Sequence, residues 1–275
     1  MADVIGFLGA GQMGEPMVHR LLAAGHDVLA HARKEAVRNR LTDAGAQLSD
    51  SVADLARRAD ILVVCLFSDD QLVELATGPD GFIAHAEPGT VVVSHVTGNV
   101  GTLDKLRSLY SDGPTVVDAP VSGSAEDIAD GKLTVLLGGD TAVLDRVEPV
   151  VRAYADPVIR TGEFGSALNL KLVNNILFAA NAQLVAAAVE LGGRLGVDGT
   201  ALLDAIASSS GRSHALASIR KVGGVDTFTQ AASPFLRKDV AACAAAAADA
   251  HVDLGWLGTV VADGPISLVK STVTE

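Results

Sequence analysis

The start of the chain carries the strongest constraint on what it can fold into. An apolar run at residues 4–8 leads directly into Gly9-Ala10-Gly11-Gln12-Met13-Gly14, and the following residues 15–24 favour a helix. In such a strand–loop–helix unit the first glycine permits a tight turn, the second lets the backbone approach a pyrophosphate, and the third lets the helix pack closely on the sheet. The helix start offers free N–H groups and a positive dipole end to phosphates. The pattern predicts a dinucleotide-binding loop formed by Gly9, Gly11, Gln12, Met13 and Gly14; the alternative is a strand–helix turn without a ligand.

The residues after the second predicted strand indicate which dinucleotide is preferred. That strand covers residues 27–31, and Ala32-Arg33-Lys34 follow it. An acidic side chain at this point would bind the ribose 2′-hydroxyl of NAD. The chain has two cations instead, and the guanidinium fork of arginine suits a phosphate. We therefore expect Arg33 and Lys34 to favour NADP(H), with NAD(H) also accepted; the alternative is a solvated surface pair.

Composition narrows the class of protein. The chain has 275 residues, 49% hydrophobic and 20% charged, which is a globular balance and enough for two domains. Its net charge of −12 argues against nucleic acid or an anionic membrane surface as a partner. The cysteines form no disulfide framework and the histidines lack ligand spacing, so we expect no metal site. The chain enters its first strand without a basic or cleavable leader, and we expect a cytoplasmic protein.

Strand and helix signals alternate through the first 160 residues or so. Continuous apolar, β-branched runs are typical of parallel strands that are buried on both faces. These runs lie at residues 61–66, 90–93, 115–118 and 133–137. Beyond residue 165 the pattern is helical only. The sequence thus predicts an α/β fold, with a Rossmann-type doubly wound sheet at residues 1–163 and an all-helical domain at residues 164–275, joined by a long inter-domain helix.

A lone charge in that long apolar helix is the second informative feature. Lys171 is the only charged residue between Glu163 and Glu190. Burial of a lysine is costly unless a partner or a lowered pKa compensates, and Asn175 lies one turn later on the same face. Asparagines interrupt the run too heavily for a lipid-spanning segment. We interpret it as a buried inter-domain helix with a functional lysine; the alternative is a lysine that reaches the surface along its own stem.

Four separated segments spanning nearly the whole chain form a recognisable set. They are Gly6-Phe7-Leu8-Gly9-Ala10-Gly11-Gln12-Met13-Gly14 with Pro16-Met17, Asp118-Ala119-Pro120-Val121-Ser122-Gly123 followed by Gly131-Lys132-Leu133, residues 162–175 around Lys171, and Lys238-Asp239. Together these segments resemble the β-hydroxyacid dehydrogenase family, which includes 3-hydroxyisobutyrate dehydrogenase and shares the nucleotide-binding domain of 6-phosphogluconate dehydrogenase.

The resemblance implies a reaction and a set of roles. The family interconverts a small 3-hydroxy acid and its semialdehyde or oxo acid with a nicotinamide cofactor. In such enzymes the counterpart of Lys171 is the general acid/base, which suits a lysine whose pKa is lowered toward neutrality. The remaining expected positions are Asn175 in catalysis, Ser122, Gly123, Ser124 and Asn174 at the substrate, and Leu66, Phe67, Thr97 and Lys238 at the cofactor. The turn at residues 122–124 also offers donors for a carboxylate; the alternative is a simple glycine loop.

Several residues depart from the family pattern and leave the substrate open. Ser124 and Ala167 stand where the family has glycines, residues 96–100 replace the usual Ser-Thr-x-x-Pro segment, and the end of the chain diverges after Trp256. An imine reductase is the nearest enzymatic alternative, although such enzymes generally replace the lysine. A non-catalytic NADP-binding sensor or scaffold is the alternative from another class. Apolar helices without a solvent face favour a homo-oligomer, which we expect to be a dimer as in relatives.

Overall fold

The computed structural model describes residues 3–109 and 112–269. Contacts divide the chain into two compact units, Met1–Lys171 and Leu172–Glu275. The division falls inside the long helix α9 (Ser166–Arg194), because the first turns of this helix belong to the hydrophobic core of the first unit. The boundary predicted from the sequence lies just before α9 begins.

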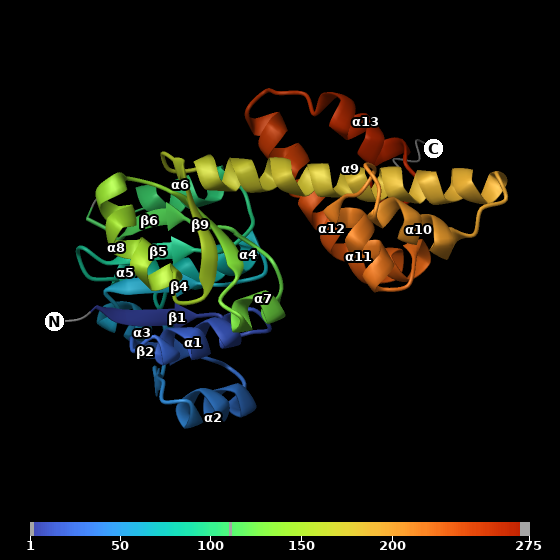
Figure 1. The fold of residues 1–275 in the computed structure, drawn as a ribbon. Coiled ribbons are helices and arrows are strands. Elements are labelled where there is room, and N and C mark those ends of the chain that lie inside the picture. Colours follow the sequence, from blue (N-terminus) through green and yellow to red (C-terminus); the bar gives the residue numbers. More distant parts are fainter. Residues whose placement is uncertain (1–2, 110–111, 270–275) are drawn as a thin grey trace. The chain divides into compact units, whose positions relative to one another are not determined.

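The first unit is built on a sheet whose strands follow the order β3-β2-β1-β4-β5-β6-β8-β7, with β9 paired to β8 (Figure 1). Its strands are β1 (Val4–Leu8), β2 (Asp27–His31), β3 (Gln47–Leu48), β4 (Ile61–Val64), β5 (Val91–Ser94), β6 (Thr115–Asp118), β7 (Val121–Ser122), β8 (Leu133–Gly138) and β9 (Ala155–Gly162). All pairs from β3 to β6 are parallel. This arrangement confirms the predicted Rossmann-type sheet, and its strand order reverses direction between β1 and β4, where such folds bind their ligands.

Hydrophobic cores lie on both faces of this sheet. The helices of the unit are α1 (Gly14–Ala23), α2 (Glu35–Asp43), α3 (Val52–Arg58), α4 (Asp69–Ala76), α5 (Phe82–His85), α6 (Val100–Ser108), α7 (Ala125–Ala129) and α8 (Thr141–Val151). Phe7 of β1 packs with Met17 of α1 in one core, whereas Leu62 of β4 packs with Leu55 of α3 in the other. Successive residues of a strand point to opposite faces, so continuous apolar runs supply both cores.

The far edge of the sheet differs from the sequence prediction. The apolar run at residues 133–137 predicts a further parallel strand, but β8 runs antiparallel to β6 and β7 and parallel to β9. The prediction of a parallel strand is wrong here because β8 folds back directly on β7 after the short helix α7, without a crossover helix that would return the chain to the other end of the sheet. The sequence also gives little sign of β9, whose residues are mostly polar or exposed.

Among its described residues, 172–269, the second unit contains helices and connecting loops but no strand, as the sequence predicts. Besides the rest of α9 it contains α10 (Gly199–Ala207), α11 (His214–Lys221), α12 (Val225–Asp249) and α13 (Gly255–Asp263). Ile176 of α9, Ile219 of α11, Phe228 of α12 and Val261 of α13 meet in its core. In the described part of the chain, α9 alone is long and apolar enough to cross a membrane by length and composition, and 50% of its most apolar window is buried inside the protein.

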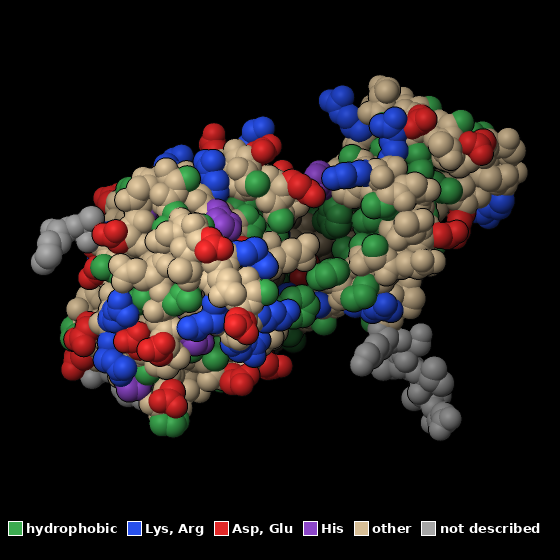
Figure 2. All heavy atoms as spheres, turned by 90° about the horizontal axis from the view of Figure 1, so that it is seen from below, with side chains coloured by type: hydrophobic (Ala, Val, Ile, Leu, Met, Phe, Trp, Pro, Cys, Tyr) green, Lys and Arg blue, Asp and Glu red, His purple; other side chains and the backbone are tan. Residues whose placement is uncertain are grey.

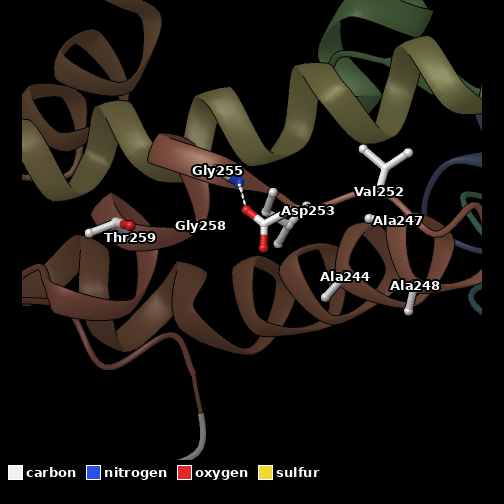
Figure 3. Close-up of a pocket in the computed structure, with 9 residues that line it drawn as sticks. Ala244, Ala247, Ala248, Val252, Asp253, Gly255, Gly258 and Thr259 are labelled. Carbon is white, nitrogen blue, oxygen red and sulfur yellow. Dashed lines mark hydrogen bonds between the residues drawn. The ribbon is translucent and has the colours of Figure 1, made fainter.

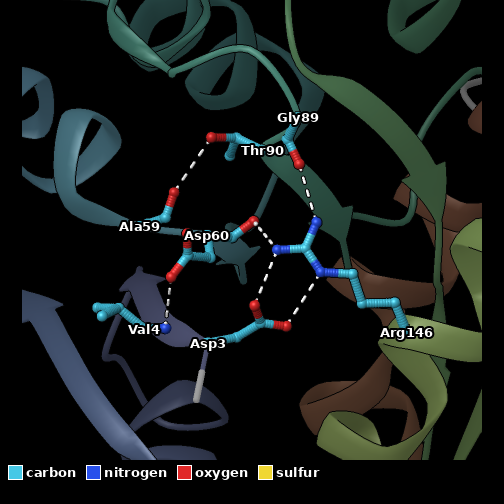
Figure 4. Close-up of polar contacts among 7 residues, drawn as sticks. All are labelled: Asp3, Val4, Ala59, Asp60, Gly89, Thr90 and Arg146. Atoms are coloured by element: carbon cyan, nitrogen blue, oxygen red, sulfur yellow. Dashed lines mark hydrogen bonds and ion pairs between the residues drawn. The ribbon is translucent and has the colours of Figure 1, made fainter. Parts of the chain in front are cut away.

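Arg146 of α8 ties together the amino-terminal ends of neighbouring strands (Figure 4). Its guanidinium donates to both carboxylate oxygens of Asp3, each at 3.0 Å, to the Gly89 carbonyl at 2.9 Å and to the Asp60 carbonyl at 3.4 Å. Asp60 in turn accepts a hydrogen bond from the Val4 N–H at 2.8 Å. The hydrogen bonds to Asp3 raise the pKa of Arg146 despite partial burial. One arginine thus fixes the segments that precede β1, β4 and β5.

We predict that Arg146→Met lowers the free energy of unfolding by about 1 kcal/mol, because the side chain is partly exposed and its ion pair is screened by water. Arg212→Met is the matched control, since Arg212 is exposed and its side chain has no partner among the described residues. Urea unfolding followed by circular dichroism measures both. Equal stability of the two variants would contradict the role given to Arg146.

Candidate functional site

The carboxyl ends of the parallel strands meet at one edge of the sheet, and the predicted cofactor residues follow this edge, except Lys238, which lies on α12 of the helical unit. The strand register aligns Leu8, His31, Val64, Ser94 and Asp118 in one row across β2, β1, β4, β5 and β6. Each predicted loop begins directly after its member of this row. Residues that lie far apart in the sequence are therefore brought to the edge where doubly wound sheets bind their ligands.

Each glycine of the loop between β1 and α1 has its own physical reason. Gly9 has a φ of +101°, and a Cβ there would lie 2.1 Å from the carbonyl oxygen of Cys65. A Cβ at Gly14 would lie 2.1 Å from the carbonyl oxygen of Gly9, so α1 can pack this closely only without one. A Cβ at Gly11 would meet no described atom within 4 Å. Protein packing does not demand a glycine at that position, whereas the close approach of a pyrophosphate would.

The start of α1 also fits a phosphate-bearing cofactor. Met13 occupies the N-cap position and makes no side-chain cap hydrogen bond. Gln12 is exposed beside it. The first N–H groups of a helix need partners from outside the helix, and an anion at this position would supply them together with charge that the helix dipole favours.

Arg33 and Lys34 lie at the same edge, one strand away from the glycine loop. They follow β2, which pairs with β1 so that His31 lies beside Leu8. Both side chains are exposed, and neither has an ion-pair partner among the described residues. Two solvent-accessible cations at this place are able to accept the 2′-phosphate of NADP.

On the other side of β1, the loops after β4 and β5 carry the predicted nicotinamide-side residues. Leu66 and Phe67 follow β4, and Phe67 exposes 58% of its surface. Its backbone N–H donates to the Gln71 side chain at 3.1 Å, which fixes the turn into α4. Thr97 follows the adjacent strand β5 and is half-buried.

Asp69, the first residue of α4, holds the loop that contains Thr97. Its carboxylate accepts hydrogen bonds from the Asn99 N–H at 2.8 Å and from the Thr102 hydroxyl at 3.2 Å. A Cβ at Gly98 would lie 1.8 Å from Asp69 Oδ1. The departure from the family pattern at residues 96–100 therefore has a structural counterpart: a glycine makes room for a carboxylate that fastens the loop.

The turn after β7 uses one of its predicted substrate donors internally. Ser124 is the N-cap of α7, where its N–H donates to Asp127 Oδ2 at 2.7 Å and its hydroxyl contacts the carboxylates of Asp127 and Glu126 at 2.9 and 3.0 Å. Those carboxylates occupy the Ser124 donors that the sequence reasoning assigns to a substrate carboxylate. Ser122 and Gly123 are the remaining members of the turn, and Gly123 has a φ of +140°.

A buried carboxylate fixes the helix that carries Lys171. Asp118 ends β6 with no exposed surface, and its two oxygens accept hydrogen bonds from the Gly165 N–H at 2.8 Å and the Leu168 N–H at 2.9 Å. These donors belong to the start of α9, where a carboxylate satisfies free N–H groups and the helix dipole. Lys171 follows one turn after Leu168 and retains 9% exposure. The lysine is therefore buried, as the sequence predicts, on a helix that is anchored to the strand edge.

In the helical unit, an acidic side chain orients Asn175. Asn175 is 7% exposed, and its Nδ2 donates to Asp239 Oδ2 of α12 at 2.9 Å. The neighbouring Asn174 is exposed and donates to Asn175 Oδ1 at 3.3 Å. These partners set the direction of the Asn175 amide and leave one of its N–H groups for another acceptor. Lys238, half-buried, lies next to Asp239 on α12.

A groove of about 370 Å³ in the helical unit is lined by none of these residues. Small side chains of α12 and α13 line it, including Ala244, Ala247 and Gly258 (Figure 3). Asp253 is its one acidic lining residue, and its carboxylate accepts the Gly255 N–H at 2.5 Å. The lining offers no acid–base pair for catalysis. Among the described residues no group of three or more histidine, cysteine, aspartate or glutamate side chains could hold a metal ion.

Sequence reasoning missed three supporting carboxylates. Asp118 lies inside a quoted motif, but its contact with α9 joins residues 47 and 50 positions apart. Asp239 follows the predicted Lys238, and its partner Asn175 lies 64 positions away. Asp69 stands 30 positions from Asn99. An acidic residue at the end of an apolar strand is the one local signal, and it applies to Asp118 alone.

Comparison with family models covers both units. Residues 4–162 match the model of the NAD binding domain of 6-phosphogluconate dehydrogenase. Residues 165–262 match the model described as NAD-binding of NADP-dependent 3-hydroxyisobutyrate dehydrogenase.

Individual proteins show the same relationship. The chain is 32% identical over 213 residues to 2-(hydroxymethyl)glutarate dehydrogenase of Eubacterium barkeri, covering 77% of this chain and 71% of that one. It is also 32% identical over 213 residues to an NAD-dependent L-serine dehydrogenase of Pseudomonas aeruginosa, covering 77% and 72%. Among solved structures, 3-hydroxyisobutyrate dehydrogenase of Mycobacterium tuberculosis with L-serine superposes with a TM-score of 0.82 at 28% identity, covering 96% of this chain and 92% of that one.

Proposed function

We propose that this chain, which belongs to the β-hydroxyacid dehydrogenase family of NAD(P)-dependent oxidoreductases, prefers NADP(H) and interconverts a small 3-hydroxy acid and its semialdehyde or oxo acid. The observation that carries the proposal is the position of Lys171: a buried lysine on a helix whose first turn is bound, through Asp118, to the same strand edge as the glycine loop. A proton donor and a dinucleotide loop in one framework are the two elements that carbonyl reduction requires.

The residues present divide the chemistry between them. The bound nicotinamide would supply or accept the hydride. Lys171 would donate a proton to the carbonyl oxygen as the alcohol forms, and would take the proton back in the oxidative direction. Asn175, whose amide is held by Asp239, would direct its second N–H at the substrate.

The turn at residues 122–124 supports the proposal that the substrate carries a carboxylate. The Ser122 hydroxyl and the backbone of Gly123 would bind the substrate carboxylate. Ser124 is better suited to hold this turn, because its donors already face Asp127 and Glu126.

We predict that Lys171→Ala lowers kcat by about 10²- to 10⁴-fold while the Kd for NADPH changes by less than about threefold, because a general acid/base contributes that much and the glycine loop is untouched. Lys221→Ala, at the end of α11, is the matched control. The assay follows NADPH absorbance with a panel of semialdehydes and, in reverse, 3-hydroxy acids.

Several results would contradict this role for Lys171. Undiminished turnover by Lys171→Ala would remove the lysine from the mechanism. Turnover of cyclic imines but of no semialdehyde would favour the imine reductase alternative, and tight NADPH binding without turnover of any compound would favour a sensor or scaffold.

The cofactor preference rests on Arg33 and Lys34. We predict that Arg33→Asp weakens NADPH binding by about 10- to 100-fold and leaves NADH binding within about threefold, because a hydrogen bond between charged groups contributes about 1.5–3 kcal/mol. Lys105→Asp on α6 makes the same change of charge away from the site and serves as the control. Fluorescence titration with both nucleotides measures the Kd values, and an unchanged ratio would make Arg33 a surface cation only.

A homodimer is proposed from the exposed face of α9. Leu170, Leu177, Leu184 and Leu191 recur every seventh residue, and their exposed fractions are 46%, 48%, 55% and 52%. Seven residues make nearly two turns, so these leucines form one stripe along the helix. Charged side chains are sparser, and hydrophobic ones more frequent, on the face of the helical unit drawn in Figure 2 than on that of the sheet unit. A stripe of this kind is typical of a helix that packs against a second copy.

We predict that Leu184→Glu converts a dimer to a monomer, because a charge would be buried at the centre of the stripe without a partner. Val73→Glu is the control, since Val73 on α4 is exposed by 40% and lies outside the stripe. Sedimentation velocity at micromolar concentration gives the mass of each. A wild-type monomer, or a Leu184→Glu dimer, would contradict the proposed interface.

A further inference from the structure

A buried histidine lies between the two loops that flank the proposed reaction centre. His95 follows β5 directly and retains 4% exposure. Its Nδ1 lies 2.5 Å from the carbonyl oxygen of Ala119, the residue after β6. Its Nε2 lies 2.9 Å from the hydroxyl of Tyr154, and the two rings meet edge to face at 88°. The imidazole thus touches the ends of two strands and the segment that leads into β9.

The partners of His95 fix its protonation state. A carbonyl oxygen can only accept a hydrogen bond, so Nδ1 carries the hydrogen. Burial lowers the pKa of His95 to about 4, although the hydrogen bond to Ala119 opposes the shift, so the ring is neutral near pH 7. Nε2 is then a bare acceptor, and the Tyr154 hydroxyl donates to it. Burial also raises the pKa of Tyr154, so its hydroxyl keeps the hydrogen that it donates.

We infer that His95 is a positioning residue that locks the loop after β5 to the loop after β6. The inference rests on the proposed function, because Thr97 lies two residues after His95 and Ser122 three residues after Ala119. The backbone already joins these strands through the Ala119 N–H and the Ser94 carbonyl at 2.8 Å. The His95 side chain adds a second tie from the opposite group of Ala119, its carbonyl. Cofactor-side and substrate-side loops are thereby held at a fixed separation.

The paired polar groups around His95 indicate that this side chain does more than fill space in the core. An apolar side chain at position 95 would fill the same space without the cost of taking two ring nitrogens out of water. Both nitrogens are instead paired, and Tyr154, which has no exposed surface, has its hydroxyl aimed at Nε2. Asp69 fastens the same loop further along, through the Asn99 N–H. The loop that contains Thr97 is therefore held on both sides of that residue.

Two amide substitutions at position 95 separate the effect of the hydrogen bond to Ala119 from the effect of filling the same space. His95→Asn places an amide N–H near the position of Nδ1 and keeps the donor to Ala119, whereas His95→Gln places its amide near Nε2 and keeps only the contact with Tyr154. We expect His95→Gln to lower kcat about 10- to 100-fold, as small misplacements of reacting groups do, and His95→Asn to stay within about threefold of wild type. Equal losses in the two variants at matched thermal midpoints would overturn the inference.

Two measurements that do not require enzymatic activity test the role of His95 separately from the proposed function. Amide hydrogen exchange read by mass spectrometry should accelerate at residues 96–99 and at residues 120–123 together in His95→Gln, and in neither segment in His95→Asn. Nitrogen NMR of wild-type protein with labelled histidines should show one imidazole ring that carries its proton on Nδ1 and none on Nε2 from pH 8 to pH 5.5. The signals of this ring should be absent from the spectrum of His95→Asn. Acceleration at one segment alone, or a ring protonated at Nε2, would overturn the inference even if the enzyme proves active.

Discussion

The hydrogen bonds that Asp118 accepts from the start of α9 are the constraint on which the rest of the site depends. The carboxylate has no exposed surface and binds two N–H groups that the helix cannot satisfy itself. Loss of this side chain would leave those groups buried and unpaired, which costs about 1–3 kcal/mol for each. Gly138 makes the contact possible, because a Cβ there would lie 2.5 Å from Asp118 Oδ1. The position of Lys171 follows from this anchor, since the lysine lies one turn further along the same helix.

A single row of strand ends organises the remaining contacts. The register from β2 to β6 brings five loops to one edge, and the loops after β1, β4, β5 and β6 are fastened by polar side chains or by glycine geometry. Asp69 holds the loop of Thr97, Ser124 and Asp127 close the turn after β7, and His95 joins neighbouring loops. Loops at a functional edge need such ties, because they lack the ladder of hydrogen bonds that fixes the strands.

Short sequence patterns predicted those features of the fold and the site that depend on residues close together in the chain. The glycine loop, the buried parallel strands, the lone lysine of α9 and the change from an alternating to a helical region are all visible within short windows. The direction of β8 could not be predicted from a short window, since it depends on the pairing of β8 with β7. Nor could the sequence show that the Ser124 donors face Asp127, or that Asp118 and Asp239 hold elements 47 and 64 residues away, because such contacts form only once the chain has folded.

Hydride transfer itself is the most direct test of the account. NADPH carrying one deuterium at C4 of the nicotinamide, prepared in both stereochemical forms, would be incubated with the wild-type protein and a panel of semialdehydes, and the products analysed by mass spectrometry. We predict that one form delivers deuterium to the carbinol carbon of a small 3-hydroxy acid, and that the corresponding aldehyde without a carboxylate is left unlabelled. Label found only in amines formed from imines, or in no product despite bound NADPH, would contradict the account.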